Sequence, residues 1–172
     1  MGLTFSVGNP DAAFIQPLAE RVRSTLASHF GTDILLDSDE ETFYSNELAW
    51  SGWSLLQEKA TEVVGSEKVP HLLAMEAWSG CYVPTNTQIG SFGFDGESTK
   101  LDVASLPELL RELELLGPAL GLPIDDPSLC KLAEKYQDDD LIDDDMEIQT
   151  YAQLLLAAHL ADRRRQVLWV VK

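Results

Sequence analysis

Alternating apolar and polar residues at the start of the chain predict a β-strand. From Leu3 to Val7 the order is Leu, Thr, Phe, Ser, Val, a period of two that is typical of a strand with one buried face. Residues 167–171, at the other end, are all apolar, which favours a strand buried on both faces of a sheet. The chain is therefore expected to begin and end in β-structure.

Apolar residues at helical spacing mark several further segments. In one of them Leu106, Leu109 and Leu113 share a face, and Ser105 with Glu108 forms a capping box at its start. Glycine or proline after such a segment predicts where the helix ends. The helices expected on this basis begin at Pro10 or Pro17 and end at Phe30, or cover residues 48–64, 105–116, 126–136 and 147–163.

Three strands are expected in the middle of the chain, in residues 71–78, 87–94 and 99–103. Asp95-Gly96 supplies turn residues between the last two strands, so this region predicts a β-meander. A short apolar run at residues 34–36 predicts one more strand. Together these elements predict a single α+β domain over all 172 residues, in which a mixed or antiparallel sheet packs in two layers against four to five helices.

Charge separates this sequence from that of an ordinary globular protein. It has 12 Lys and Arg against 29 Asp and Glu, a formal net charge of −17. Residues 102–149 hold 14 of the acidic residues and three of the basic ones, whereas Arg163–Arg165 follow at the end of the last expected helix. Phosphate backbones and anionic membranes repel such a chain, so we predict no nucleic-acid and no membrane partner, and instead a protein with a basic surface.

Two acidic segments are candidates for the contact with that partner. One is a loop after the expected strand at residues 34–36, and the other is an aspartate tract before the last helix. The tract has a second interpretation as a solvated loop, since negative charge is favourable near a helix N-terminus. The candidate partner-binding residues are Asp37, Asp39, Glu40, Glu41, Asp138, Asp139, Asp140, Asp143, Asp144 and Asp145.

The aspartate tract was also compared with known metal-binding patterns. Asp139, Asp140 and Asp143 have the DDxxD spacing with which isoprenoid synthases hold magnesium, but those enzymes are large helical bundles and this chain is short and rich in strands. An EF-hand starting at Asp138 would have Gln149 in place of its bidentate glutamate. We therefore predict no metal centre and no cofactor, and only weak binding of divalent cations by the tract.

A catalytic alternative rests on Cys81, with His71 as a candidate base for a thiolate mechanism. Cys81 lies in the segment from Trp78 to Tyr82, whose aromatic residues could line a ligand pocket. Nothing in the spacing selects His71 over His29 or His159. The same cysteine and aromatic residues would serve equally as ordinary core residues.

The favoured function is therefore a non-enzymatic interaction protein, an inhibitor or immunity-type partner that presents carboxylates to a basic protein. Cys81 and Cys130 form no paired motif, and no signal peptide or membrane span is evident, so the cytoplasm is the expected location. The alternatives are a small enzyme or ligand-binding protein with an aromatic pocket near Trp78–Tyr82, and a subunit or scaffold of a larger assembly.

Overall fold

The C-terminal strand lies in the middle of the sheet. The structure is a computed structural model that describes residues 2–75, 79–94, 99–135 and 145–171. Strand β7 (Val167–Val171) pairs antiparallel with β1 (Gly2–Gly8) on one side and with β4 (Ser79–Val83) on the other. The remaining strands are β2 (Phe43–Tyr44), β3 (Leu48–Ala49), β5 (Gly90–Phe94) and β6 (Thr99–Ser105), in the order β2-β1-β7-β4-β6-β5 with β3 beside β1.

Both faces of β7 are buried, as its apolar sequence predicts. Leu168 and Val170 belong to one core cluster, and Val167 and Trp169 belong to another on the opposite face. The indole nitrogen of Trp169 donates a hydrogen bond to the Gly8 carbonyl oxygen at 3.0 Å. The predicted strands at the two ends of the chain are thus confirmed, and the structure shows that they pair with each other.

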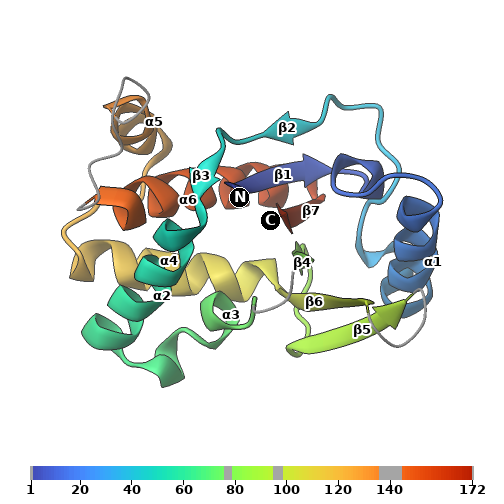
Figure 1. Ribbon diagram of the computed structural model, residues 1–172, viewed down its shortest axis with the longest axis horizontal. Coiled ribbons are helices and arrows are strands. Elements are labelled where there is room, and N and C mark those ends of the chain that lie inside the picture. Colours follow the sequence, from blue (N-terminus) through green and yellow to red (C-terminus); the bar gives the residue numbers. More distant parts are fainter. Residues whose placement is uncertain (1, 76–78, 95–98, 136–144, 172) are drawn as a thin grey trace.

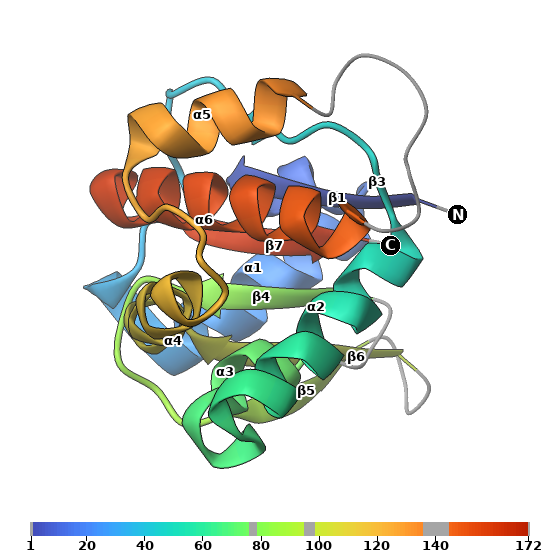
Figure 2. The same cartoon turned by 90° about the vertical axis from the view of Figure 1, so that its left-hand side faces the viewer.

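Helices cover the two faces of the sheet unequally (Figure 1). The larger core cluster contains side chains of α2, α4 and α6, and the smaller one contains Val22, Leu26 and Phe30 of α1. Figure 2 shows α5 lying outside α6, on the far side from the sheet. The helices are α1 (Leu18–Phe30), α2 (Trp50–Val64), α3 (Pro70–Leu73), α4 (Leu106–Ala119), α5 (Asp126–Lys135) and α6 (Met146–Arg164).

The α+β class, the mixed sheet and the buried C-terminal strand are confirmed. Half of the predicted capping box is present, since the Ser105 hydroxyl accepts from the Glu108 amide at 3.3 Å. The Ser105 amide instead donates to the His71 ring, and the Glu108 carboxylate pairs with Arg111. The predicted end at residue 116 is too early, because helix α4 continues to Ala119 with Pro118 inside its last turn. No helix in the described ranges is long and apolar enough to cross a membrane.

The predicted meander is wrong in its first strand. Residues 70–73 form α3, and the first strand of this region, β4, begins only at Ser79. Pro70 suits a first helical turn, and the Glu112 carboxylate accepts from the amides of His71 and Leu72 at 2.9 and 2.8 Å. A short apolar run of this kind is ambiguous between helix and strand until such a partner is known.

The sheet order corrects the meander further. Strands β5 and β6 are antiparallel neighbours, as expected, but β4 runs parallel to β6 and does not pair with β5. The turn predicted at Asp95-Gly96 lies outside the described residues. The strand predicted at residues 34–36 is reduced to a single bridge between Leu35 and Gln166.

Candidate interaction surface

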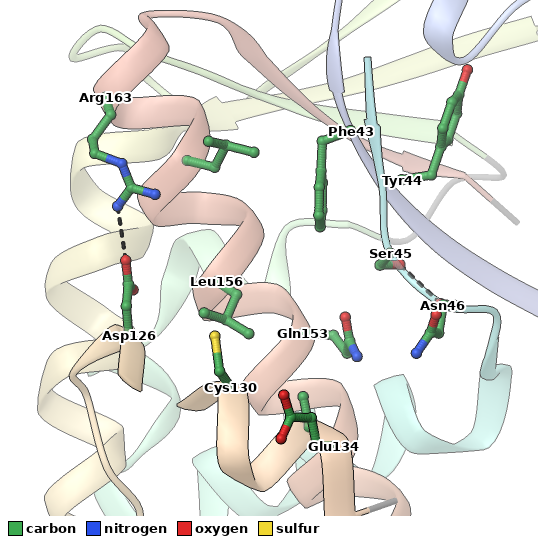
Figure 3. A pocket seen from close by; sticks show the side chains of 12 residues that line it. Phe43, Tyr44, Ser45, Asn46, Asp126, Cys130, Glu134, Gln153, Leu156 and Arg163 are labelled. Atoms are coloured by element: carbon green, nitrogen blue, oxygen red, sulfur yellow. Dashed lines mark hydrogen bonds and ion pairs between the residues drawn. The ribbon is translucent and has the colours of Figure 1, made fainter. Parts of the chain in front are cut away.

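A groove of about 370 Å³ runs along the outer side of α6 (Figure 3). Leu156 and Leu160 of α6 form an apolar floor. One wall is α5 and the other is the segment that contains β2, so the three parts come from distant stretches of the sequence. The lining residues are Phe43, Tyr44, Ser45, Asn46, Asp126, Cys130, Ala133, Glu134, Gln153, Leu156, Leu160 and Arg163.

Helix α5 is fixed to α6 through its buried face and its first residue. Leu129 and Ala133 are buried against the core. The Asp126 carboxylate contacts both the His159 ring, with Oδ1 2.6 Å from Nδ1, and Arg163, whose Nη1 lies 2.9 Å from Oδ2. Consequently Asp126 and Arg163 neutralise each other at one end of the groove, while Glu134 lies at the other end (Figure 3).

The opposite wall is held by hydrogen bonds to β1. The Ser45 amide donates to the Phe5 carbonyl at 2.8 Å, and the Phe5 amide donates to the Ser45 hydroxyl at 2.9 Å. Phe43 turns toward the core and is half-buried, whereas Tyr44 is 57% exposed. The Phe43 ring therefore faces the apolar floor, whereas the exposed Tyr44 ring points away from it (Figure 3).

The acidic loop lies next to this groove. The side chain of Arg164, adjacent in sequence to the groove residue Arg163, pairs with Glu40, with Nε 2.6 Å from Oε2, and donates from Nη1 to the Glu41 carbonyl oxygen at 2.9 Å. Asp37 forms an ion pair with Arg23 of α1. Asp37, Asp39, Glu40 and Glu41 are all exposed. Two of the four candidate carboxylates in this loop are thus paired within the chain.

Most of the predicted aspartate tract lies outside the described residues, namely Asp138, Asp139, Asp140, Asp143 and Asp144. Asp145 is described; it is half-buried and immediately precedes α6. On its other side, the tract follows α5, which ends at Lys135, one residue after Glu134 of the groove. The chain therefore enters the tract from a wall of the groove.

The catalytic candidates have the contacts of structural residues. Cys81 is fully buried, and burial, reinforced by the nearby Asp102, raises the pKa of its thiol, which disfavours the thiolate. The His71 ring accepts the Ser105 amide proton at Nδ1, 3.1 Å away. Burial lowers the pKa of His71 despite the opposing charge of Glu108, and a neutral ring suits that acceptor role.

The described aromatic candidates are likewise core residues. Trp53 and Tyr82 are buried in the core, and the Tyr82 hydroxyl donates to the His71 carbonyl oxygen at 2.9 Å. Trp50 and Phe92 are partly buried against the two core clusters. Trp78 lies outside the described residues. Tyr82 has no free surface with which to line a ligand pocket.

Within the described ranges, no group of three or more His, Cys, Asp and Glu side chains is placed to hold a metal ion. The candidates Asp139, Asp140 and Asp143 fall outside those ranges. The groove residues Tyr44, Cys130 and Glu134 were missed by sequence reasoning. Tyr44 belongs to a strand of two residues, too short to give a periodic signal, and no pattern links it to α5.

The described structure thus combines an acidic surface with this groove, while the catalytic candidates Cys81 and His71 have structural contacts. A family model described as "Putative DNA-mimic protein" matches residues 12–166, and the chain belongs to this family. No curated protein and no solved structure matches the chain. At this level the expectation of an acidic protein that acts by binding other proteins agrees with the family.

Proposed function

We propose that this protein binds a DNA-binding protein at its basic, DNA-contacting surface and thereby competes with DNA. The observation that carries the proposal is the net charge of −17 on a chain of the DNA-mimic family. Duplex DNA presents about one negative charge per 1.7 Å of its axis, and its protein partners neutralise these charges with Lys and Arg. A folded protein with clustered carboxylates can occupy the same basic surface.

The carboxylates best suited to this role are those that form no ion pair with an arginine or lysine of the same chain. In the acidic loop, Arg23 and Arg164 pair with Asp37 and Glu40, but no cation of the described residues is recorded against the side chains of Asp39 and Glu41. The tract from Asp138 to Asp145 adds six aspartates within eight residues. Such clusters accelerate the encounter with a basic partner and exclude acidic ones.

Capture followed by elution with DNA tests this proposal. The protein is immobilised, a cell extract treated with nuclease is passed over it at low salt, and the bound proteins are eluted with a 20-base-pair duplex. We expect DNA-binding proteins in the eluate. A matched column carries the variant in which the six tract aspartates are replaced by asparagine, and it should retain less. Bound proteins that the duplex fails to release would contradict the proposal.

A further inference from the structure

The geometry points to the groove between α5 and β2 as the place where one arginine side chain of the basic partner is held. This inference rests on the proposed function, and it adds a defined contact to what would otherwise be an attraction between charged surfaces. Its starting point is the combination of an apolar floor, the ring of Phe43 and a carboxylate at one end of the groove.

The groove suits the two parts of an arginine side chain. The three-carbon stem of arginine can cover an apolar surface while its guanidinium stays at the polar edge, and Leu156 and Leu160 supply such a floor. The planar guanidinium stacks on aromatic faces and forms paired hydrogen bonds with a carboxylate. Glu134, exposed on α5, supplies the carboxylate, and the half-buried ring of Phe43 faces the groove from β2 (Figure 3).

The charges of the groove also indicate at which end the guanidinium of the partner's arginine lies. At one end Asp126 is already bonded to His159 and Arg163, so a second cation there would meet Arg163. At the other end no cation of the described residues is recorded against Glu134, which lies near Asn46 (Figure 3). The guanidinium of the partner is therefore expected at the Glu134 end, with its stem over Leu156.

Arginine is also the residue that this class of partner supplies. DNA-binding proteins use arginine for phosphate contacts and for base contacts, and the net charge of −17 selects for a basic surface. Electrostatic attraction of that kind sets association rate and salt dependence more than affinity, which depends on a few buried anchors. The groove would provide one such anchor on this protein.

Cys130 provides a probe inside the groove, because it is exposed there whereas Cys81 is buried. The protein is titrated at low salt with a 20-residue helical peptide of alanine and arginine, and binding is followed by fluorescence anisotropy. The rate at which maleimide labels Cys130 is measured alongside. We expect saturating peptide to slow labelling at least tenfold, and spermine, a cation without the arginine shape, to leave the rate nearly unchanged.

Matched variants locate the contact. Glu134→Gln and Leu156→Ala should each weaken binding of the peptide about three- to tenfold, since a central anchor loses that much when truncated. Glu62→Gln and Leu115→Ala make the same chemical changes at exposed positions on α2 and α4 and should have less than a twofold effect. In a protein that carries both Cys130→Ser and Glu62→Cys, the thiol at position 62 should stay accessible to maleimide when the peptide is bound.

The outcomes separate this inference from the proposed function. Peptide that binds without protecting Cys130, or that binds Glu134→Gln and Glu62→Gln equally, overturns the groove contact while leaving competition with DNA intact. Peptide that does not bind at low salt overturns both. Protection that spermine reproduces would show a general effect of charge on the labelling reaction and would likewise overturn the groove contact.

Discussion

The Asp126 carboxylate of α5 is bonded to the His159 ring of α6, with Oδ1 2.6 Å from Nδ1. Burial acting alone would raise the pKa of Asp126, but its hydrogen bonds with His159 and Arg163 outweigh burial, so the pKa lies below its ordinary value. These contacts join the start of α5 to the last turns of α6. They therefore fix one wall of the groove described above.

Replacing Asp126 by asparagine should loosen α5. We expect a loss of about 1 kcal/mol in the free energy of unfolding at pH 7, a modest value because the contact is partly exposed. A depressed carboxyl pKa stabilises the fold above the ordinary pKa, and this contribution is lost as pH falls through the folded value. Urea unfolding at pH 7 and pH 3 should therefore show a larger difference at pH 7 than at pH 3.

The control for that substitution is Asp39→Asn, which changes the same side chain at an exposed loop position. It should leave stability within about 0.5 kcal/mol of the original protein. Hydrogen exchange should quicken in the α5 amides of Asp126→Asn alone. Equal stability of the two variants at pH 7 would show that Asp126 does not hold the helix.

Glu112 should make stability depend on pH in the opposite direction. Burial raises the pKa of Glu112 to about 7, although the amides of His71 and Leu72 oppose the shift. A carboxyl whose pKa is raised in the fold contributes stability that is complete below its ordinary pKa and is lost as pH rises through about 7. Relative to Glu112→Gln, the original protein should lose on the order of 2 kcal/mol between pH 5 and pH 8.

Urea unfolding of the two proteins at pH 5 and pH 8 measures this difference. The glutamine variant keeps every other acidic group, so the comparison cancels the general repulsion among carboxylates. Stability curves that run parallel for the two proteins across this range would rule out titration of Glu112.

Gly52 allows α2 to cross closely over the start of α6. A Cβ atom at this position would lie 2.9 Å from the Met146 carbonyl oxygen and would also meet the Thr150 hydroxyl. Gly to Ala in a helix interior normally stabilises by up to about 1 kcal/mol, but here overpacking should reverse the sign and cost about 1–3 kcal/mol. Thermal unfolding measures the change.

Gly93→Ala in β5 is the comparison, because a Cβ there would meet nothing within 4 Å. Its effect on the unfolding temperature should be small. If Gly52→Ala is as stable as Gly93→Ala, the two helices have room to move apart and the close crossing is not a constraint.

Neutralising the aspartate tract should slow association with the basic partner. Replacing Asp138, Asp139, Asp140, Asp143, Asp144 and Asp145 by asparagine changes the net charge from −17 to −11. We expect the association rate at low salt to fall about tenfold and to depend less on salt. Stopped-flow mixing at several salt concentrations gives both quantities.

A second variant with the same net charge tests whether position matters. It replaces six exposed carboxylates elsewhere by their amides, at Asp11, Asp33, Glu58, Glu62, Glu67 and Glu114. Its association rate should fall less than that of the tract variant. Equal association rates would mean that the net charge of the protein, and not the position of the tract, determines the association rate.

Periodic segments could be predicted from the sequence because their burial is regular. The alternating residues of β1 and the wholly apolar sequence of β7 predicted both strands, so the two ends of the chain were predicted correctly. The capping residues Ser105 and Glu108 likewise gave the start of α4. Such signals depend only on neighbours along the chain.

The elements and surfaces that were not predicted depend on contacts between residues far apart in the sequence. The helix at residues 70–73 depends on Glu112, about 40 residues later, and no local sequence pattern predicts that contact. The groove combines β2, α5 and α6, and its exposed residue Tyr44 belongs to a strand of only two residues. The sequence could therefore predict an acidic interaction protein but not the groove between α5, α6 and β2.

Competition with DNA on a purified DNA-binding partner, one eluted by the duplex in the capture experiment, tests the proposed function most directly. A fluorescent duplex is bound to that protein, the acidic chain is titrated in, and anisotropy reports the free duplex. We predict complete release of the duplex, with a midpoint that rises in proportion to the DNA concentration, as competition for one surface requires. A ternary complex that keeps the duplex bound at saturating acidic chain would contradict the proposal.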